Sequence, residues 1–153
     1  MRQFVCPGCG AVNRAPDAKD PREARCGRCK AVVFAGKPLE VSGSQLRKHR
    51  DSTKGVALLL DVWAPWCGPC RAMAPQFAAA AAKLEPDVRL LKLNSEVEQQ
   101  AAADLGVTGI PALFLFLDGR IVARTAGLMN ADQIIAWTRQ ALAQARAGAN
   151  TGA

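Results

Sequence analysis

The six cysteines of this 153-residue chain stand in three Cys-x-x-Cys pairs: Cys6/Cys9, Cys26/Cys29 and Cys67/Cys70. Two thiols at this spacing suit metal ligation or redox exchange. The opening residues lack the apolar core of a secretory signal, and no run approaches the roughly 18 apolar residues of a membrane span. We therefore expect a cytoplasmic protein with no membrane partner. Thiols stay reduced there, so metal binding or catalysis is favoured over permanent structural bridges.

Cys67 and Cys70 lie in the stretch WAPWCGPCR, directly after the apolar run GVALLLDV. We predict that a helix begins at about Cys67, where unpaired N–H groups and the helix dipole stabilise an anion. This position lowers the pKa of Cys67 and increases its reactive thiolate fraction, while Cys70, one turn later, can reach the same sulfur. Pro69 fits a first helical turn, because an N–H there has no helical partner to lose. The pattern is typical of thiol–disulfide exchange.

Asp61 is the one carboxylate in the apolar strand that precedes this pair, six residues before Cys67. If the carboxyl group is buried under Cys70, desolvation raises its pKa and lets it accept the proton that Cys70 loses before attacking. Alternatively, Asp61 stands at a strand end and is satisfied by local hydrogen bonds. The residues alone leave both interpretations open.

The other four cysteines form two knuckles, CPGCG and CGRCK, separated by a polar spacer. They can place four sulfurs at the corners of a tetrahedron, which predicts one structural zinc ion held by Cys6, Cys9, Cys26 and Cys29. Two local disulfides, a second redox pair or an iron–sulfur cluster are the alternatives. Because so short a polar segment has little core, we expect metal binding to supply its folding free energy.

Positive charge is concentrated near the N-terminus. Residues 1–37 hold eight Lys/Arg and three Asp/Glu, whereas residues 38–153 hold twelve and ten. Four zinc-bound thiolates would leave a site of net charge −2, which nearby cations offset. We favour this explanation over a nucleic-acid partner.

The remainder of the chain alternates between strand and helix patterns. A short strand and a helix capped by Ser42 or Ser44 come first, and the predicted order continues to a βαβαβαββα arrangement. Further signals are a capping box at Ser95 and Glu98, a reciprocal cap at Asn130, and a type I′ hairpin turn at Asp118-Gly119. This order predicts an α/β fold, with a mixed central sheet covered by helices on both faces.

Three domain segments follow from this reading: a zinc ribbon at 1–36, an α/β domain at 37–148 and a flexible tail at 149–153. Two single residues are assigned by their surroundings. His49, flanked by Arg47, Lys48 and Arg50, is expected to be solvated. Trp63 is expected to be a core aromatic residue.

The WCGPC string, with Asp61 upstream and Thr108-Gly109-Ile110-Pro111 downstream, resembles thioredoxin. With the N-terminal knuckles included, the chain is similar to the zinc-containing second type of bacterial thioredoxin. The resemblance implies a thioredoxin fold, a cis bond before Pro111, and Lys92 close to Asp61. It also implies a substrate-docking surface formed by Trp66, Gly68, Pro69, Ile110 and Gly127.

The same resemblance implies a two-step protein-disulfide reductase. Cys67 attacks a substrate disulfide, and Cys70, helped by Asp61, then attacks Cys67 to leave a Cys67–Cys70 disulfide. The implied partners are disulfide-containing proteins and an NADPH-dependent thioredoxin reductase, and we expect a monomer. Two alternatives stay open: a zinc-ribbon binding module that uses the α/β domain as a scaffold, and a redox switch in which oxidation releases zinc.

Overall fold

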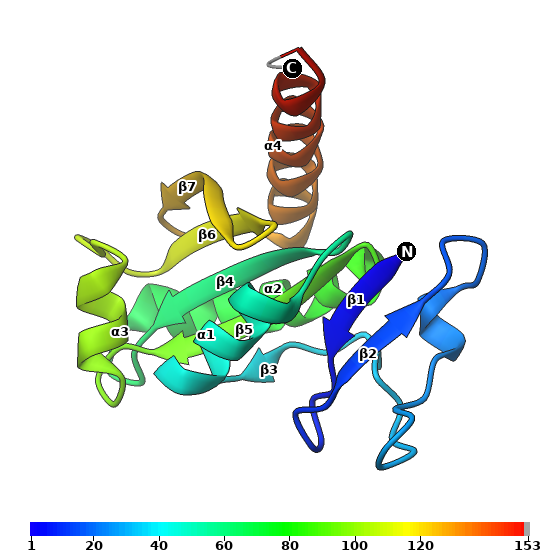
Figure 1. The fold of residues 1–153 in the computed structure, drawn as a ribbon. Helices are drawn as coiled ribbons and strands as arrows, with labels where there is room; N and C mark the ends of the chain where they lie inside the picture. The colour runs from blue at the N-terminus through cyan, green and yellow to red at the C-terminus, as the bar shows by residue number, and fades with distance from the viewer. Residues whose placement is uncertain (152–153) are drawn as a thin grey trace.

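The computed structural model describes residues 1–151, with side chains described through residue 148. Of the tail expected at 149–153, residues 149–151 belong to the last helix and residues 152–153 lie outside the described part. Two sheets occur in this part of the chain (Figure 1). The larger contains β3 (Leu39–Glu40), β4 (Ala57–Trp63), β5 (Val88–Asn94), β6 (Ala112–Leu117) and β7 (Arg120–Ala126).

The central sheet has the strand order β3-β5-β4-β6-β7. Strands β3, β4 and β5 run parallel, whereas β6 pairs antiparallel with both β4 and β7. The mixed sheet predicted from the element order is therefore confirmed. Because β4 lies in the centre and is apolar over nearly its whole length, the segment that precedes the Cys67–Cys70 pair is held firmly on both sides.

Helices cover both faces of the central sheet, as predicted. These are α1 (Gly43–Ser52), α2 (Gly68–Leu84), α3 (Gln99–Asp104) and α4 (Ala131–Thr151). Successive side chains of β4 point to opposite faces. Leu59 packs in one core with Phe77 of α2 and Ile134 of α4, whereas Leu60 packs in a second core with Leu46 of α1.

The local turn and cap predictions have mixed outcomes. Ser42 caps α1 in a complete capping box with Gln45, and the backbone N–H groups and side chains of Asn130 and Gln133 hydrogen-bond reciprocally at 2.9 Å. The turn residues Asp118 and Gly119 both have positive φ, at 50° and 80°, as a type I′ turn requires. All three predictions are confirmed, and each concerns residues at most three positions apart.

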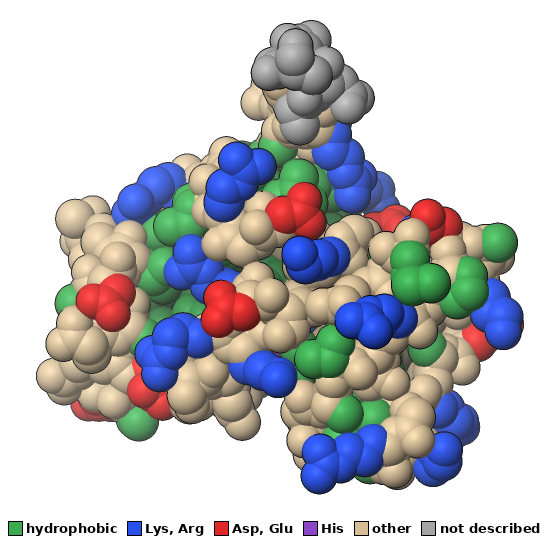
Figure 2. All heavy atoms as spheres, in the orientation of Figure 1, with side chains coloured by type: hydrophobic (Ala, Val, Ile, Leu, Met, Phe, Trp, Pro, Cys, Tyr) green, Lys and Arg blue, Asp and Glu red, His purple; other side chains and the backbone are tan. Residues whose placement is uncertain are grey.

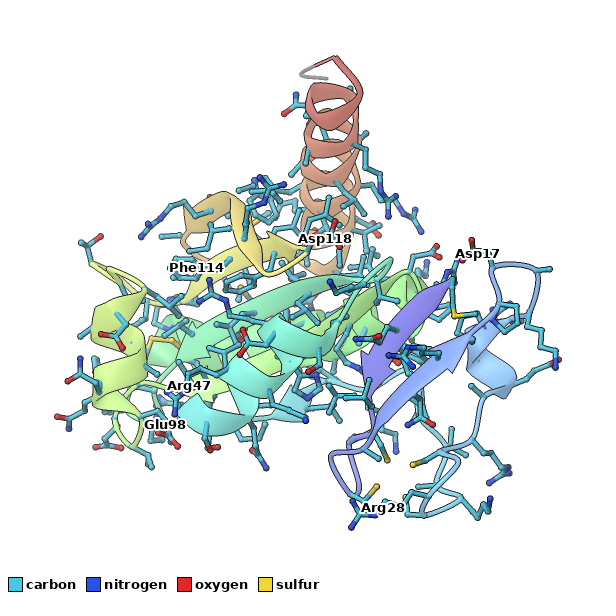
Figure 3. The ribbon with its side chains drawn as sticks, in the orientation of Figure 1. Asp17, Arg28, Arg47, Glu98, Phe114 and Asp118 are labelled. Carbon is cyan, nitrogen blue, oxygen red and sulfur yellow. A yellow bond between two sulfur atoms is a disulfide. The ribbon has the colours of Figure 1, made fainter. Side chains whose placement is uncertain are left out.

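The capping box predicted at Ser95 and Glu98 is wrong. The Ser95 hydroxyl donates instead to the backbone carbonyl of Trp63, at 3.0 Å. Helix α3 begins after Glu98, which forms no side-chain cap within the described structure. Glu98 lies near Arg47 where the N-termini of α1 and α3 meet (Figure 3), and a Cβ added at Gly43 would come within 3.6 Å of its Oε2.

The N-terminal module, residues 1–36, contains β1 (Arg2–Val5), β2 (Val12–Ala15) and a short 3-10 helix, η1 (Pro21–Glu23). Strands β1 and β2 form an antiparallel pair beside α1 (Figure 1). Gln3 and Lys54 exchange two backbone hydrogen bonds of 2.8 Å, which extend the pairing to the chain after α1. The module is therefore packed against the α/β domain.

A buried ion pair strengthens this junction. Arg89 of β5 is 2 % exposed and pairs with Glu85 at 3.3 Å. The same guanidinium donates to the Val33 carbonyl at 2.8 Å and lies 4.2 Å from the centroid of the Phe34 ring. Glu85 in turn accepts a 2.7 Å hydrogen bond from the N–H of Gly36. Because both charges are buried and fully engaged, removing either partner would leave the other uncompensated.

His49 is buried, so the solvated environment expected for it is wrong. Only 5 % of the residue is exposed. Burial lowers its pKa to about 4, with a smaller contribution from the charge of Arg89. His49 lines one pocket with Val5 and Cys6, so it faces the N-terminal module, whereas Arg47 is exposed on α1.

No helix in the described residues is both long and apolar enough to cross a membrane.

Candidate active site and metal centre

Cys67 and Cys70 form a disulfide at the start of α2. Cys67 is the N-cap residue, and its sulfur accepts a 3.2 Å hydrogen bond from the Cys70 N–H. The N–H of Arg71 closes the first turn on the Cys67 carbonyl at 3.1 Å. The helix begins where the sequence predicts. Gly68 and Pro69 occupy its first turn, where a backbone N–H has no helical partner, so the N–H that proline lacks costs no helical hydrogen bond.

An open groove of about 770 Å³ gives access to this pair. Cys67 itself is only 5 % exposed, but it lies in the wall of the groove. Trp66, 67 % exposed, stands beside it. Cys70 is 2 % exposed and does not line the groove. An incoming disulfide would therefore meet the first sulfur before the second.

The predicted docking residues only partly coincide with the groove. Trp66, Gly68, Pro69 and Ile110 line it, and the Ile110 carbonyl lies 3.9 Å from the Cys67 sulfur. Gly127 is not among the lining residues. Its N–H donates to the carbonyl of Pro111 at 2.9 Å, and its φ of 109° suits glycine.

The peptide bond between Ile110 and Pro111 is cis. A second cis bond, Glu85–Pro86, was not expected from the sequence. Sequence reasoning also did not assign the rest of the groove lining to the docking surface. This part comes from the turn before α3, from α3 itself and from the loop after it: Ser95, Gln99, Ala102, Ala103, Val107, Thr108 and Gly109. A mixed polar and small-residue segment carries no chemical signal of its own, so only the fold could place it opposite Cys67.

Asp61 is completely buried on β4, and neither carboxyl oxygen has a hydrogen-bond partner in the described structure. The alternative in which local hydrogen bonds satisfy this aspartate is therefore wrong. Desolvation raises its pKa to about 7, while the charge of Lys92 acts to lower it and that of Glu40 acts to raise it. Alternation along β4 places Asp61 on the face of Leu59, which is the face that α2 covers.

Trp63 is less deeply buried than a core aromatic residue. Its indole N–H lies 3.1 and 3.2 Å from the two carboxylate oxygens of Glu40. The ammonium of Lys92 stands 4.7 Å from the ring centroid. The ring also packs against the cluster that contains Cys67 and Cys70, so it connects the cysteine pair with two charged side chains.

The other four cysteines come together in the N-terminal module. All are free thiols, and their sulfurs lie within 4.8 Å of one another. The shortest contacts run between the knuckles, with 3.5 Å from Cys6 to Cys29 and 3.6 Å from Cys9 to Cys26. A tetrahedral zinc site with Zn–S bonds of about 2.3 Å places its sulfurs about 3.8 Å apart. The residues therefore fit a four-thiolate metal ion, whereas disulfides within each knuckle would need the opposite pairing.

Hydrogen-bond donors surround these sulfurs. The Cys6 sulfur accepts from the N–H of Gly8 at 3.3 Å. The pKa of Cys26 is lowered to about 5, mainly by the hydrogen bond from the Cys29 N–H and next by the amide of Asn13. The pKa of Cys29 moves the other way, to about 11: the hydrogen bond from the Ala31 N–H acts to lower it, but hydrogen bonding with the other thiols and burial outweigh that effect. Lys and Arg side chains lie over the module (Figure 2), with Arg28 at the knuckle tip beside sulfur atoms (Figure 3). These donors and cations stabilise thiolates, the form in which cysteine binds a metal ion.

The fold and the two cysteine sites define a class of protein. A redox-active disulfide at the N-terminus of a helix, with a buried carboxyl group on the sheet face that this helix covers, is the arrangement of a thiol–disulfide oxidoreductase. The family model for thioredoxin matches residues 43–140. The chain therefore belongs to the thioredoxin family, whose members are thiol–disulfide oxidoreductases.

Among its relatives, thioredoxin C-3 of Corynebacterium nephridii is 36 % identical over 141 residues, which cover 92 % of this chain and 96 % of that protein. This match is longer than residues 37–148 and so reaches into the N-terminal module. A thioredoxin of Chlamydia muridarum is 41 % identical over 85 residues, which cover 56 % of this chain and 82 % of the relative.

Solved thioredoxins share the fold. A mutant thioredoxin from Halobacterium salinarum has a TM-score of 0.61 at 30 % identity, covering 69 % of this chain and 90 % of its own. Spinach chloroplast thioredoxin f has a TM-score of 0.65 at 27 % identity, covering 71 % of this chain and 88 % of its own.

Proposed function

We propose that this protein is a protein-disulfide reductase in which Cys67 is the nucleophile, Cys70 the resolving thiol and Asp61 the proton acceptor. The observation that carries the proposal is the position of the pair. Cys67 stands in the wall of an open groove and Cys70 behind it, on the sheet face where Asp61 is buried without a hydrogen-bond partner.

The reaction proceeds in two steps. In the reduced protein, the Cys67 thiolate attacks one sulfur of a substrate disulfide, forms a mixed disulfide and releases the first substrate thiolate. Cys70 then transfers its proton to Asp61 and attacks the Cys67 sulfur. The Cys67–Cys70 bond forms as the bond to the substrate breaks, so the substrate gains two electrons and the pair loses two. A reductant must then restore the dithiol.

We propose that the docking surface receives an extended peptide. Trp66 and Ile110 contribute apolar side chains to the groove that Cys67 lines, Gly68 and Pro69 line it at the helix start, and Gly127 is hydrogen-bonded to Pro111, the residue after Ile110. We propose disulfide-containing proteins as substrates, a monomeric cytoplasmic protein, and an NADPH-dependent thioredoxin reductase as the source of electrons. Thioredoxins are reduced by such enzymes, which supports the last assignment.

We further propose that Cys6, Cys9, Cys26 and Cys29 hold one structural zinc ion. The measured sulfur separations and the N–H donors support this assignment. A four-thiolate ion leaves no open coordination position, so when bound it would stabilise the module and supply no chemistry to the substrate. Residues 1–36 and 37–148 would then form the zinc ribbon and the thioredoxin domain.

Substitution of the leading cysteine tests the reductase. With dithiothreitol as electron source and a protein disulfide as substrate, we expect Cys67→Ser to abolish turnover, since serine cannot form the mixed disulfide. Ala79→Ser is the control, because it introduces a hydroxyl at an exposed position of α2 and leaves both the groove and the four knuckle cysteines unchanged. If Cys67→Ser reduces the substrate as fast as the wild type does, the proposed function is wrong.

A further inference from the structure

Two carboxylates and one lysine form a row across three neighbouring strands. In the register of the sheet, Glu40 of β3 is paired with Lys92 of β5, and Lys92 is paired with Asp61 of β4. Paired residues of parallel strands point to the same face, about 4.8 Å apart from strand to strand. Lys92 therefore stands between an exposed acid at the sheet edge and a buried acid at its centre.

Trp63 ties this row to the cysteine pair. It follows Asp61 by two residues on β4 and so lies on the same face. Its indole N–H is held by the Glu40 carboxylate, its ring lies under the Lys92 ammonium, and it packs in the cluster of Cys67 and Cys70. Glu40 thus contacts Trp63 directly and competes with Asp61 for the charge of Lys92.

The charged groups that act on Asp61 come from two strands. Lys92 acts from β5 and favours the ionised carboxylate, whereas Glu40 acts from β3 and opposes it. On the other side, β6 pairs Leu113 with Asp61, and helix α2, which begins after Cys67 and contains Cys70, covers the same sheet face. A lysine engaged by Asp61 alone would hold that carboxyl group permanently ionised and make it a poorer proton acceptor.

We propose that Glu40 is a positioning residue for the resolving step. Glu40 shares Lys92 with Asp61 and holds Trp63, and so keeps Asp61 able to take the proton of Cys70. This inference rests on the proposed reductase function and adds to it a residue from the edge strand. The proton moves from the Cys70 sulfur to a carboxylate oxygen of Asp61, and the resulting thiolate attacks Cys67 as described above. Glu40 touches neither sulfur.

Glu40→Gln separates the charge from the hydrogen bond, because glutamine still offers an oxygen to Trp63. Removing one negative charge roughly 10 Å from Asp61 at the protein surface is expected to lower the pKa of Asp61 by about half a unit. The titration of the Asp61 carboxyl carbon, followed by ¹³C NMR in the oxidised protein, measures this. The pH profile of the resolving step, observed as release of thiol from a preformed mixed disulfide, should shift by the same amount.

Three further variants make the result specific. Glu40→Asp keeps the charge and should restore the wild-type midpoint, while Lys92→Met should move it upward. Glu96→Gln removes an exposed acid just after β5 that does not act on Asp61, and should leave the midpoint unchanged.

Two results overturn the role of Glu40. One is an Asp61 midpoint that is the same in Glu40→Gln as in Glu96→Gln. The other is a midpoint that moves without the matching shift in the resolving step. Both leave the reductase intact if turnover still depends on Cys67. Failure of the reductase itself is recognised separately, as full turnover by Cys67→Ser.

Discussion

The three Cys-x-x-Cys segments begin with the same turn and end differently. In each, the N–H four residues after the first cysteine donates to that cysteine's carbonyl: Gly10 to Cys6 at 3.0 Å, Lys30 to Cys26 at 2.9 Å and Arg71 to Cys67 at 3.1 Å. In each, the first sulfur also accepts a backbone N–H from within the motif. The two-residue spacing therefore determines a turn but not a function.

The residue at the fourth position after the first cysteine makes the difference. Gly10 and Lys30 have φ of 77° and 66°, so the chain turns back, and the next carbonyl accepts from the N–H of the first cysteine at 2.8 and 2.9 Å. Arg71 is helical and belongs to α2, which runs for 17 residues from Gly68 to Leu84. One turn thus becomes a knuckle that presents sulfur to a second knuckle, or a helix start that presents sulfur to a groove.

Metal removal is expected to have the largest effect, and to separate the two kinds of site. Structural zinc contributes about 10–16 kcal/mol to small metal-dependent folds. We expect one zinc per chain. After chelation, we expect amide hydrogen exchange to become fast at Gly10 and Lys30 and to stay slow at Leu59. Metal analysis and exchange mass spectrometry measure both quantities. Unchanged exchange at the knuckles after complete metal removal would contradict the comparison, because the module would then be stable without an ion.

The buried carboxyl group of the catalytic region should weaken the fold in a pH-dependent way. The pKa of Asp61 is about 7 against an ordinary value of 3.8. Between these values the folded protein binds more protons than the unfolded chain, so this group lowers stability as pH rises. Asp61→Asn should therefore unfold like the wild type below about pH 4 and gain at most about 4 kcal/mol above pH 7.

Urea unfolding of the oxidised protein at pH 4 and pH 8 provides the measurement. Asp51→Asn, at an exposed position on α1, is the control for a changed surface charge. A gain for Asp61→Asn that is equal at both pH values would show that the carboxyl group is not desolvated in the folded state.

The smallest predicted effects test the turn itself. Lys30 has positive φ, so Lys30→Gly relieves backbone strain and should stabilise the module by about 1 kcal/mol. At the equivalent position of α2, Arg71→Gly should instead destabilise the helix by about 1 kcal/mol. Each is compared with its alanine variant, because Lys30 and Arg71 both donate side-chain hydrogen bonds. Thermal unfolding of the metal-loaded protein gives both values, and effects of the same sign would disprove the distinction.

Much of the fold could be predicted because its signals are local. The cap at Ser42, the cap at Asn130, the turn at Asp118 and the start of α2 each depend on residues only a few positions apart, and each lies where expected. Part of the candidate site could be predicted in the same way. The three cysteine pairs and the apolar strand before Cys67 are visible in residue type and spacing, whereas the residues alone left open whether Asp61 is buried or is satisfied by local hydrogen bonds.

The failures share a cause, since each involves a partner distant in the sequence. Ser95 could have capped α3, but the Trp63 carbonyl, 32 residues away, takes its hydroxyl. His49 is flanked by cations in the sequence but is buried, and it lines one pocket with Val5 and Cys6 of the N-terminal module. The burial of Arg89 could not be predicted from its neighbours in the sequence, because its contacts with the Val33 carbonyl and the Phe34 ring come from a distant segment.

By itself, the sequence determined the order of strands and helices, the three cysteine turns and the ionisable group on the central strand. These depend on backbone preferences, side-chain periodicity and hydrogen bonds within a few residues. Only the tertiary structure decided that the knuckle sulfurs face each other, that α3 forms the far wall of the groove, and that Glu40 stands in line with Lys92 and Asp61. Those relations arise from strand register and packing, which join residues that the chain keeps far apart.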